Sequence, residues 1–407
     1  MRLAITFGFN QVISHGFGVF LFAALVPMMQ HTININSWYL ALAGALTQIS
    51  YLAGAMLLGV VGHRLDSGRT LLVTGSLTSS LLFIMGWLND PIIMMCLLTI
   101  MAASAAMSWG SIVELVTRHG RADRTSTNLS IASSGTAWGY SVNGLIILLI
   151  APLLGWRSSW MVASVLGLVV VFTTFSLLKS MRNQAQSQDI DVNFAVAMGT
   201  KQLFKTVFRE RTAFLSCLIL LLVGASTITF TTWLNTYLAE LSLPPALGGY
   251  TWSMIGLTGM IAGFFVGKLA DKKGHGVTLL SIFGIFGIFA LGLVAFSFHP
   301  AHFVLLAGFG YGMMYFPIWG IVAGWVSKQY SSKATMQING IGMVAFGLGG
   351  SLGNLLAGMI HEATGSLQNI YWLICALGIV LFILATYIFL QERQSKTTMV
   401  GDISPAA

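Results

Sequence analysis

Long apolar stretches follow one another along this chain, separated by short polar breaks. A helix needs roughly 20 apolar residues to cross the ~30 Å hydrocarbon core of a bilayer. Twelve stretches meet this requirement, and none shows the sustained polar and apolar alternation of a membrane barrel strand, so each is predicted to be a transmembrane helix. The predicted spans are 4–29, 37–62, 70–89, 91–117, 127–153, 158–180, 213–239, 247–268, 277–298, 302–327, 334–360 and 368–390.

The composition agrees with a membrane location. Hydrophobic residues make up 56% of the 407 residues, and the mean hydropathy of +0.82 excludes a water-soluble globule of this length. With the N-terminus inside, all of the 20 Lys and Arg residues except Arg157 fall on the cytoplasmic side. We therefore expect a multi-pass protein of the plasma membrane, specifically a bacterial inner membrane, with both termini cytoplasmic. Topology also accounts for the net charge of +8, so no nucleic-acid partner is expected.

The longest polar break divides the chain into two halves. The predicted fold is an all-α membrane protein with twelve transmembrane helices in two six-helix bundles. The predicted divisions are an N-terminal bundle at 1–182, a cytoplasmic linker with an amphipathic segment at 183–211, a C-terminal bundle at 212–391 and a cytoplasmic tail at 392–407.

The two halves share an internal repeat. Gly62 and Gly267 are 205 residues apart, and so are Asp66 and Asp271. Both pairs fall between the second and third helices of their half. Parallel duplication of a six-helix unit is typical of a large class of transporters whose substrate site lies between the halves.

The repeated loops also carry a family signature. "GKLADKKG", residues 267–274, fits the pattern G-x-L-A-D-[RK]-x-G, and "GWRSSW", residues 155–160, is another recurrent element of the same family. The chain therefore resembles the major facilitator superfamily along its whole length. The resemblance implies that Asp66 and Asp271 are latches of the state closed to the cytoplasm; the alternative is a turn with topology-signalling cations. The predicted gating motif comprises Gly62, Asp66, Gly68, Arg69, Gly267, Asp271, Lys272 and Gly274.

Polar and aromatic side chains at mid-membrane depth are expected to face a substrate cavity, because they are costly in contact with lipid. Asn10 and Gln11 on the first helix belong to this polar group. The aromatic members could instead serve only for packing. The residues predicted to line the cavity are His15, Gln48, Tyr51, Trp109, Tyr140, Asn143, Trp233, Tyr311, Tyr315 and Trp319.

Two ionisable groups within the predicted helices are candidates for proton coupling. His15 could bind substrate, relay a proton, or be a neutral histidine that one neighbour satisfies. Glu114 lies one helical turn before Arg118, which predicts either a salt bridge that gates or stabilises the helix end, or a proton-coupling carboxylate.

The predicted function is secondary transport of a small organic metabolite by alternating access, with proton coupling open. "FGVF", residues 17–20, resembles a segment of monocarboxylate and oxalate/formate transporters, but the predicted helices lack a deep basic residue that would pair with an anion. The alternative is proton-driven drug efflux. The fifth-helix signature of those drug exporters is G-x-x-x-G-P-x-x-G-G. This chain has the signature glycines at Gly135, Gly139 and Gly144, but Tyr140 replaces the proline and Asn143 replaces a glycine. We expect the lipid bilayer, a small-molecule substrate and protons as partners, a monomer, and no enzyme activity, cofactor or metal.

Overall fold

The computed structural model describes residues 1–35, 37–187, 197–244, 246–295 and 302–401. Eleven helical segments within these ranges are long and apolar enough to cross a membrane, and α12 is a shorter apolar helix. The helical elements are α1 (Arg2–Gln11), η1 (Val12–Phe20), α2 (Leu21–Met29), α3 (Ser37–Val61), η2 (Gly62–Arg64), α4 (Ser67–Met85), α5 (Pro91–His119), η3 (Ala122–Arg124), α6 (Thr125–Leu145), η4 (Ile146–Ile150), α7 (Ala151–Leu154), α8 (Trp156–Ser187), α9 (Thr200–Arg209), α10 (Arg211–Glu240), α11 (Ala246–Lys273), α12 (His275–Ala295), α13 (His302–Val326), α14 (Ser332–Thr364) and α15 (Gln368–Gly401).

The predicted all-α fold with twelve membrane helices is confirmed. Two of the crossings are not uniform α-helices. The first is interrupted by the π-helix η1, and the fifth by the π-helix η4. A π-helical turn displaces side chains from the regular α-helical spacing, and such turns are frequent at functional sites. The side chains of η1 are therefore presented differently from those of a straight helix.

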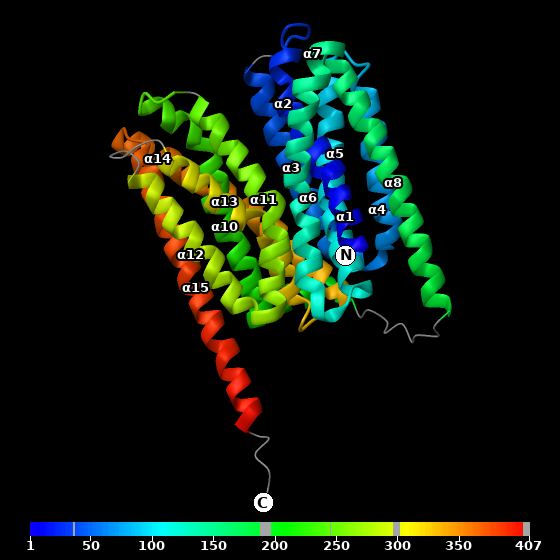
Figure 1. Cartoon of the computed structure of the whole chain (residues 1–407), viewed down its shortest axis with the longest axis vertical. Coiled ribbons are helices and arrows are strands. Elements are labelled where there is room, and N and C mark those ends of the chain that lie inside the picture. Colours follow the sequence, from blue (N-terminus) through cyan, green and yellow to red (C-terminus); the bar gives the residue numbers. More distant parts are fainter. Residues whose placement is uncertain (36, 188–196, 245, 296–301, 402–407) are drawn as a thin grey trace, which may run out of the picture.

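The helices form two groups in space. Figure 1 shows α1 to α8 in one bundle and α10 to α15 in the other. The two bundles lie together at one end and diverge towards the other. Contact between them runs mainly through α6 with α11 and α13, and through α3 with α14.

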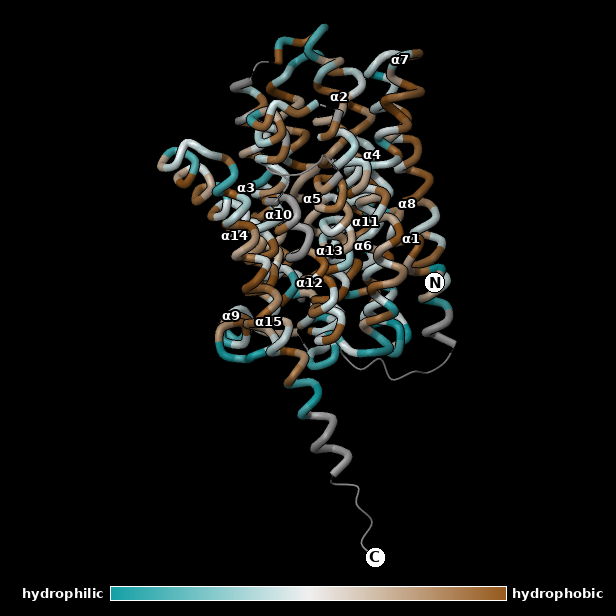
Figure 2. The backbone as a smooth tube through the Cα atoms, turned by 60° about the vertical axis from the view of Figure 1, so that its left-hand side comes forward, coloured by the Kyte–Doolittle hydropathy of each residue, from teal (hydrophilic) through white to brown (hydrophobic). Residues whose placement is uncertain are grey.

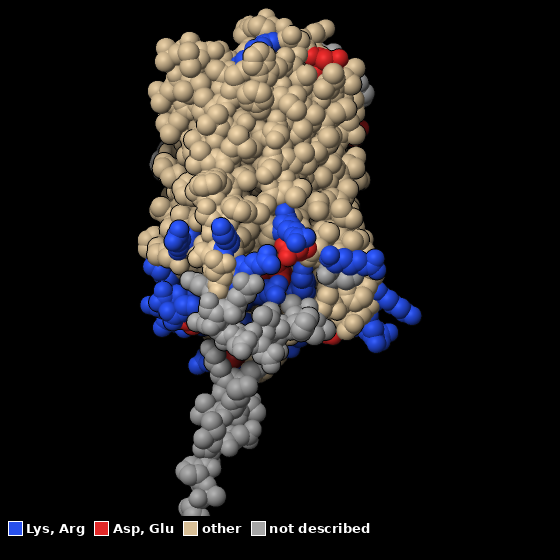
Figure 3. Space-filling model, turned by 90° about the vertical axis from the view of Figure 1, so that its right-hand side faces the viewer, with Lys and Arg blue, Asp and Glu red and all other residues tan. Residues whose placement is uncertain are grey.

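One end of the molecule carries most of the charge. Figure 3 shows Lys and Arg side chains gathered around the end at which the bundles meet, while the wall above it is almost free of charge. Figure 2 shows hydrophilic backbone concentrated in the turns at both ends and hydrophobic backbone along the helices. We call the charged end the basic end; it is defined by Arg64, Arg69, Arg118, Arg121, Arg124, Lys268, Lys272, Lys328 and Lys333.

The segment between the bundles is fixed to the second bundle at the basic end. The buried Gln337 side chain on α14 accepts from the Met198 N–H and donates to the Met198 carbonyl, each at 2.9 Å. Leu203 and Val207 of α9 are buried in the same contact. Tyr330 donates its hydroxyl to Glu210 Oε2 at 2.7 Å, and burial together with this carboxylate raises the pKa of Tyr330 well above its usual value.

Parts of the predicted divisions fall outside the described residues. These are 188–196 of the predicted linker and 402–407 of the predicted tail. At the edges of the linker, α8 continues to Ser187 and α9 begins at Thr200. The helix α15 continues through the first ten residues of the predicted tail, to Gly401.

Candidate functional site

A central cavity of about 800 Å³ lies between the two bundles. Each bundle contributes four membrane crossings to its wall. The lining residues are Gln11, His15, Val19, Phe20, Ala23, Ala24, Gln48, Tyr51, Trp109, Ser133, Thr136, Tyr140, Asn143, Gly144, Ile147, Ile228, Thr231, Trp252, Ile255, Gly256, Tyr311, Tyr315, Phe316, Trp319 and Phe346. Nine of the ten residues predicted to line a substrate cavity are in this set.

Uncharged groups make up the polar part of the wall. Among the described lining residues none is Asp, Glu, Lys or Arg. Gln11, Trp109 and Asn143 are nearly fully buried, at 2, 3 and 3% exposure. Gln11 Nε2, Trp109 Nε1 and Asn143 Oδ1 have no hydrogen-bond partner within the described chain. Residues of the wall thus carry two donor atoms and one acceptor atom that are buried without a partner in the described chain. A buried polar group without a partner is costly unless a ligand or water satisfies it.

His15 is held on η1 by neighbouring hydroxyl groups. Its Nε2 lies 3.2 Å from the Tyr51 hydroxyl, and its Nδ1 lies 3.1 Å from Ser14 Oγ. A hydroxyl can either donate to or accept from an imidazole nitrogen, so both ring nitrogens are satisfied in the neutral form. On the opposite side of the first crossing, Asn143 Nδ2 donates to the Gly16 carbonyl at 2.7 Å and ties η1 to α6.

Aromatic rings from both bundles form another part of the wall. Phe20 stacks on Tyr140 with ring centroids 4.7 Å apart, and Tyr311 stacks on Tyr315 at 4.9 Å. Tyr140 of the first bundle also meets Phe316 of the second edge to face at 6.4 Å. Such rings offer flat apolar surfaces to a ligand while their polar edges remain available.

Three predicted residues lie elsewhere. Trp233 does not line the cavity; its ring lies 6.0 Å from that of His361. Glu114 is buried at 1% exposure outside the cavity wall, and its Oε1 lies 3.6 Å from Arg118 Nη1. Asn10 points into the first bundle, where its Nδ2 donates to Thr174 Oγ1 at 2.8 Å. For Trp233 and Asn10, polar or aromatic character did not show that the side chain turns away from the cavity.

The sequence did not single out several residues of the wall. Phe20, Trp252, Phe316 and Phe346 are aromatic, and membrane helices contain many such residues that serve only for packing. Ser133 and Thr136 are hydroxyl residues, which commonly bond back to their own helix. A signal that could have found Thr136 is its four-residue spacing from Tyr140, which places both on one helix face.

The basic end is closed by a contact of Asp271 with the other bundle. Its Oδ1 accepts from the Ser126 N–H at 3.1 Å, and its Oδ2 accepts from the Thr127 N–H at 2.8 Å and the Thr127 hydroxyl at 2.6 Å. The carboxylate of α11 thereby caps the N-terminus of α6, whose own N-cap residue, Arg124, makes no side-chain cap. His275 Nε2 lies 2.8 Å from the Ser126 hydroxyl and extends the contact.

The repeated aspartate of the first half has a different arrangement. Asp66 Oδ1 accepts from the Arg69 N–H at 2.7 Å and caps its own helix, α4. The reason is local: α3 ends at Val61, and Asp66 follows in extended backbone, whereas α11 continues through Asp271 and turns only at Gly274, where φ is 105°. The first loop instead reaches the second bundle through Lys333, whose Nζ donates to the Leu65 carbonyl at 2.6 Å.

The two aspartates should consequently respond differently to substitution. Asp271→Asn removes the charge and replaces one acceptor oxygen by a donor. Hydrogen bonds to a charged group contribute about 1.5–3 kcal/mol, so we expect the ratio of molecules with the basic end closed to those with it open to fall by about tenfold or more. Asp66→Asn is the matched control, because Asn caps its own helix as well as Asp does. The measurement is alkylation of Ser133→Cys, from the basic side, in a chain without its native cysteines. Equal alkylation in the two variants would contradict this assignment.

The comparisons with known proteins agree on the fold. Residues 9–340 match the profile of the Major Facilitator Superfamily. Solved structures of FucP from this superfamily, one of them in an outward conformation and another described as the E. coli fucose:proton symporter, have TM-scores of 0.72 and 0.71 at 14 and 15% identity, covering 95% of this chain and 97% of theirs. The proton:xylose symporter XylE, bound to 6-bromo-6-deoxy-D-glucose, has a TM-score of 0.70 at 13% identity, covering 94% of each chain.

No curated protein sequence matches the chain. At these identities the solved structures establish the fold alone, whereas the family profile spans most of the chain. Together with the duplicated bundles, the helices long enough to cross a bilayer and the cavity between the halves, this match defines the class. The chain belongs to the Major Facilitator Superfamily of transporters and is an integral, multi-pass membrane protein.

Proposed function

We propose that the protein is a secondary transporter that moves a small, uncharged organic solute by alternating access. The observation that carries this proposal is the central cavity, which both bundles line and which combines aromatic surfaces, unused amide and indole groups, and no charged side chain among the described lining residues. A charged solute would lose its hydration there without gaining a counter-ion, which is costly. An uncharged solute with hydroxyl, carbonyl or amide groups can use the donors and the acceptor.

The bundles act as the two moving halves in this proposal. We assign residues 1–182 and 212–391 to them, with 183–211 as the cytoplasmic linker and 392–407 as the cytoplasmic tail. The basic end faces the cytoplasm, because Lys and Arg are retained on that side. Both termini are then cytoplasmic, and the closed contact at Asp271 belongs to the state open to the outside. One chain surrounds the cavity, so a monomer in the bacterial inner membrane suffices.

Drug efflux is the second candidate. The aromatic wall and the volume of about 800 Å³ favour it, because flat apolar compounds fit such a surface. Tyr140 and Asn143 occupy the wall at the two positions where the efflux signature has Pro and Gly. Net export of aromatic dyes from loaded vesicles, without uptake of any metabolite, would favour efflux over metabolite transport.

Reconstituted protein tests the main proposal directly. The thermal midpoint of the protein is measured with panels of uncharged, anionic and cationic metabolites of similar size. Uptake into proteoliposomes is then measured for each compound that raises the midpoint. We expect binding and uptake to be confined to uncharged compounds. Trp109→Ala should weaken binding by about two- to tenfold, since aromatic contacts contribute about 0.5–1.5 kcal/mol each. Trp233→Ala, which alters a tryptophan outside the cavity, is the control. Transport of only charged compounds would refute the proposal.

Proton coupling is proposed through His15 or Glu114. His15 lies on the cavity wall, and Glu114 is buried five residues after Trp109 on α5, which is ~7.5 Å along a helix. The fold neighbours FucP and XylE are proton symporters. We expect His15→Ala or Glu114→Gln to abolish the substrate-dependent pH change in proteoliposomes, and His361→Ala, outside the cavity, to preserve it. An unchanged pH signal in both variants would remove coupling from these positions.

A further inference from the structure

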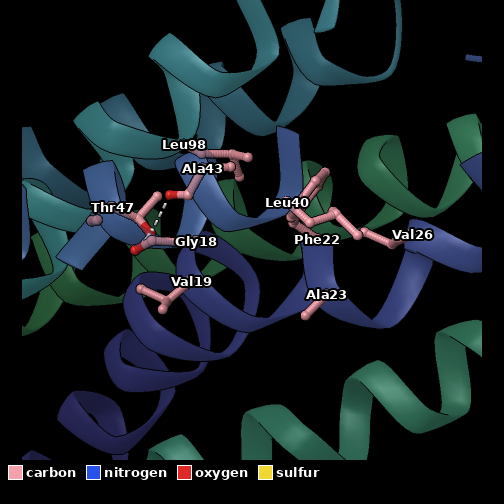
Figure 4. A pocket seen from close by; sticks show the side chains of 11 residues that line it. Gly18, Val19, Phe22, Ala23, Val26, Leu40, Ala43, Thr47 and Leu98 are labelled. Carbon is pink, nitrogen blue, oxygen red and sulfur yellow. Dashed lines mark hydrogen bonds between the residues drawn. The ribbon is translucent and has the colours of Figure 1, made fainter. Parts of the chain in front are cut away.

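A side pocket of about 350 Å³ lies within the first bundle, beside the central cavity. Figure 4 shows its residues coming from the first crossing, from α3 and from α5. The part of the first crossing involved runs from Gly18 to Val26, and the part of α3 runs from Leu40 to Thr47. This void is distinct from the contact at the basic end described above.

Small side chains on facing helices create the pocket. Gly18 and Ala23 lie on the first crossing, Ala43 and Gly44 on α3, and Ala102 on α5. A Cβ atom added at Gly44 would meet no atom within 4 Å. Helix bundles are normally packed with few voids larger than a water molecule, so an opening of this size leaves room for a ligand group.

The chemistry of the pocket favours an apolar occupant. Thr47 has the only polar side chain among the described lining residues. Its hydroxyl hydrogen is already directed to its own helix, where Thr47 Oγ1 lies 2.8 Å from the Ala43 carbonyl and 3.0 Å from the Gly44 carbonyl (Figure 4). A polar group placed here would lose its hydrogen bonds to water and would find only the Thr47 oxygen as a side-chain acceptor, whereas an alkyl or aryl group has no hydrogen bonds to lose.

The pocket adjoins the central cavity. Val19 and Ala23, one helical turn apart, belong to the walls of both. These two side chains separate the voids, so an arm that passes them would reach the side pocket from the central cavity. The residues with unpartnered polar atoms, Gln11, Trp109 and Asn143, line the central cavity and not the side pocket.

We propose that the side pocket binds the apolar arm of the transported solute, which makes the substrate an uncharged amphiphile. The inference rests on the proposed transport function and narrows its substrate class. An apolar cavity of about 150 Å³ holds one benzene molecule, so a pocket of about 350 Å³ has room for an arm of up to about twelve carbon atoms. The polar head occupies the central cavity, and Val19 and Ala23 mark the boundary between head and arm.

Filling the pocket tests the inference. Gly44→Leu places a side chain in the open space of the pocket, and Gly358→Leu on α14 is the matched control, since its Cβ also meets no atom within 4 Å and it lines neither cavity. The probes are alkyl β-glucosides and 1-O-alkyl glycerols with arms from methyl to hexyl. Binding to protein in nanodiscs is measured by calorimetry, with empty nanodiscs subtracted.

We expect at least one of the two series, the glucosides or the glycerols, to show a gain with arm length. In the unaltered chain and in Gly358→Leu, its hexyl member should bind at least tenfold more tightly than its methyl member. In Gly44→Leu this gain should fall below threefold, while the methyl compound binds as before. A gain retained in Gly44→Leu, or no binding by any member of either series, overturns the side-pocket assignment. A phospholipid that co-purifies with the unaltered chain and is lost in Gly44→Leu, without an arm-length effect, would show a lipid site instead and also overturns it. If the side-pocket assignment fails in either way, transport of an uncharged solute without an apolar arm into proteoliposomes would still support the proposed transport function.

Discussion

Gly320→Ala is expected to open the basic end. A Cβ atom at this position of α13 would lie 2.3 Å from the backbone N of Ser130 on α6. Backbone atoms cannot rotate aside, so the two bundles must separate locally. Gly263 on α11 meets the same turn of α6, with a Cβ position 2.2 Å from the Ser130 carbonyl oxygen. The closed state thus depends on glycines from two helices, and overpacking such a contact costs about 1–3 kcal/mol.

Spin labels at the basic end measure this effect. Labels replacing Arg121 in the first bundle and Lys273 in the second report the separation of the bundles. We expect the distance distribution of Gly320→Ala to shift to longer values, with the closed population lowered by tenfold or more. Gly249→Ala on α11 is the control, because its Cβ would meet no atom within 4 Å. An unchanged distribution in Gly320→Ala would contradict the close approach of α13 to α6.

Gly135→Leu is expected to prevent the first bundle from folding. A Cβ atom there would lie 2.0 Å from the Gly8 carbonyl oxygen, which places α6 and α1 in backbone contact. One helical turn further along, Gly139 and Gly16 meet in the same way, with a Cβ at Gly139 only 2.5 Å from the Gly16 Cα. These two contacts fix the first crossing and η1 against α6, so the clash cannot be relieved by a side-chain movement.

The measurement is the yield of monodisperse protein together with its thermal midpoint in detergent. We expect Gly135→Leu to lower the stability by about 3 kcal/mol or more, the upper end for an overpacked contact, and to give little folded protein. Gly144→Leu on the same helix is the control for stability, because its Cβ would meet nothing within 4 Å. A midpoint for Gly135→Leu equal to that of the control would show that α1 and α6 are further apart than described.

Helix positions were predictable to within a few residues for most crossings. The predicted span 302–327 corresponds to α13 at His302–Val326, and 37–62 to α3 at Ser37–Val61. Length and hydropathy suffice for this, because the bilayer requires every backbone group to bond within its own helix. The π-helices η1 and η4 were not predictable, since their sequences are as apolar as those of the neighbouring helices.

Residues of the central cavity were predictable as a group and less well one by one. His15, Tyr51 and Trp109 reach the wall, while Trp233 does not. The polar or aromatic character of a side chain indicates that it needs a polar or aromatic neighbour. A buried helix can offer such a neighbour on more than one of its faces, so the character alone does not show which face points to the cavity. Asn10, for example, is satisfied by Thr174 inside its own bundle.

The sequence by itself determined that this chain is a duplicated set of membrane helices with cations at the breaks, because both features follow from local composition and spacing. Only the tertiary structure decided how the repeated aspartates act. Asp66 and Asp271 occupy the same place in the repeat, but one caps its own helix and the other caps a helix of the opposite bundle. The difference depends on where the preceding helix ends and which helix terminus lies within hydrogen-bond distance, and both are properties of the packed molecule.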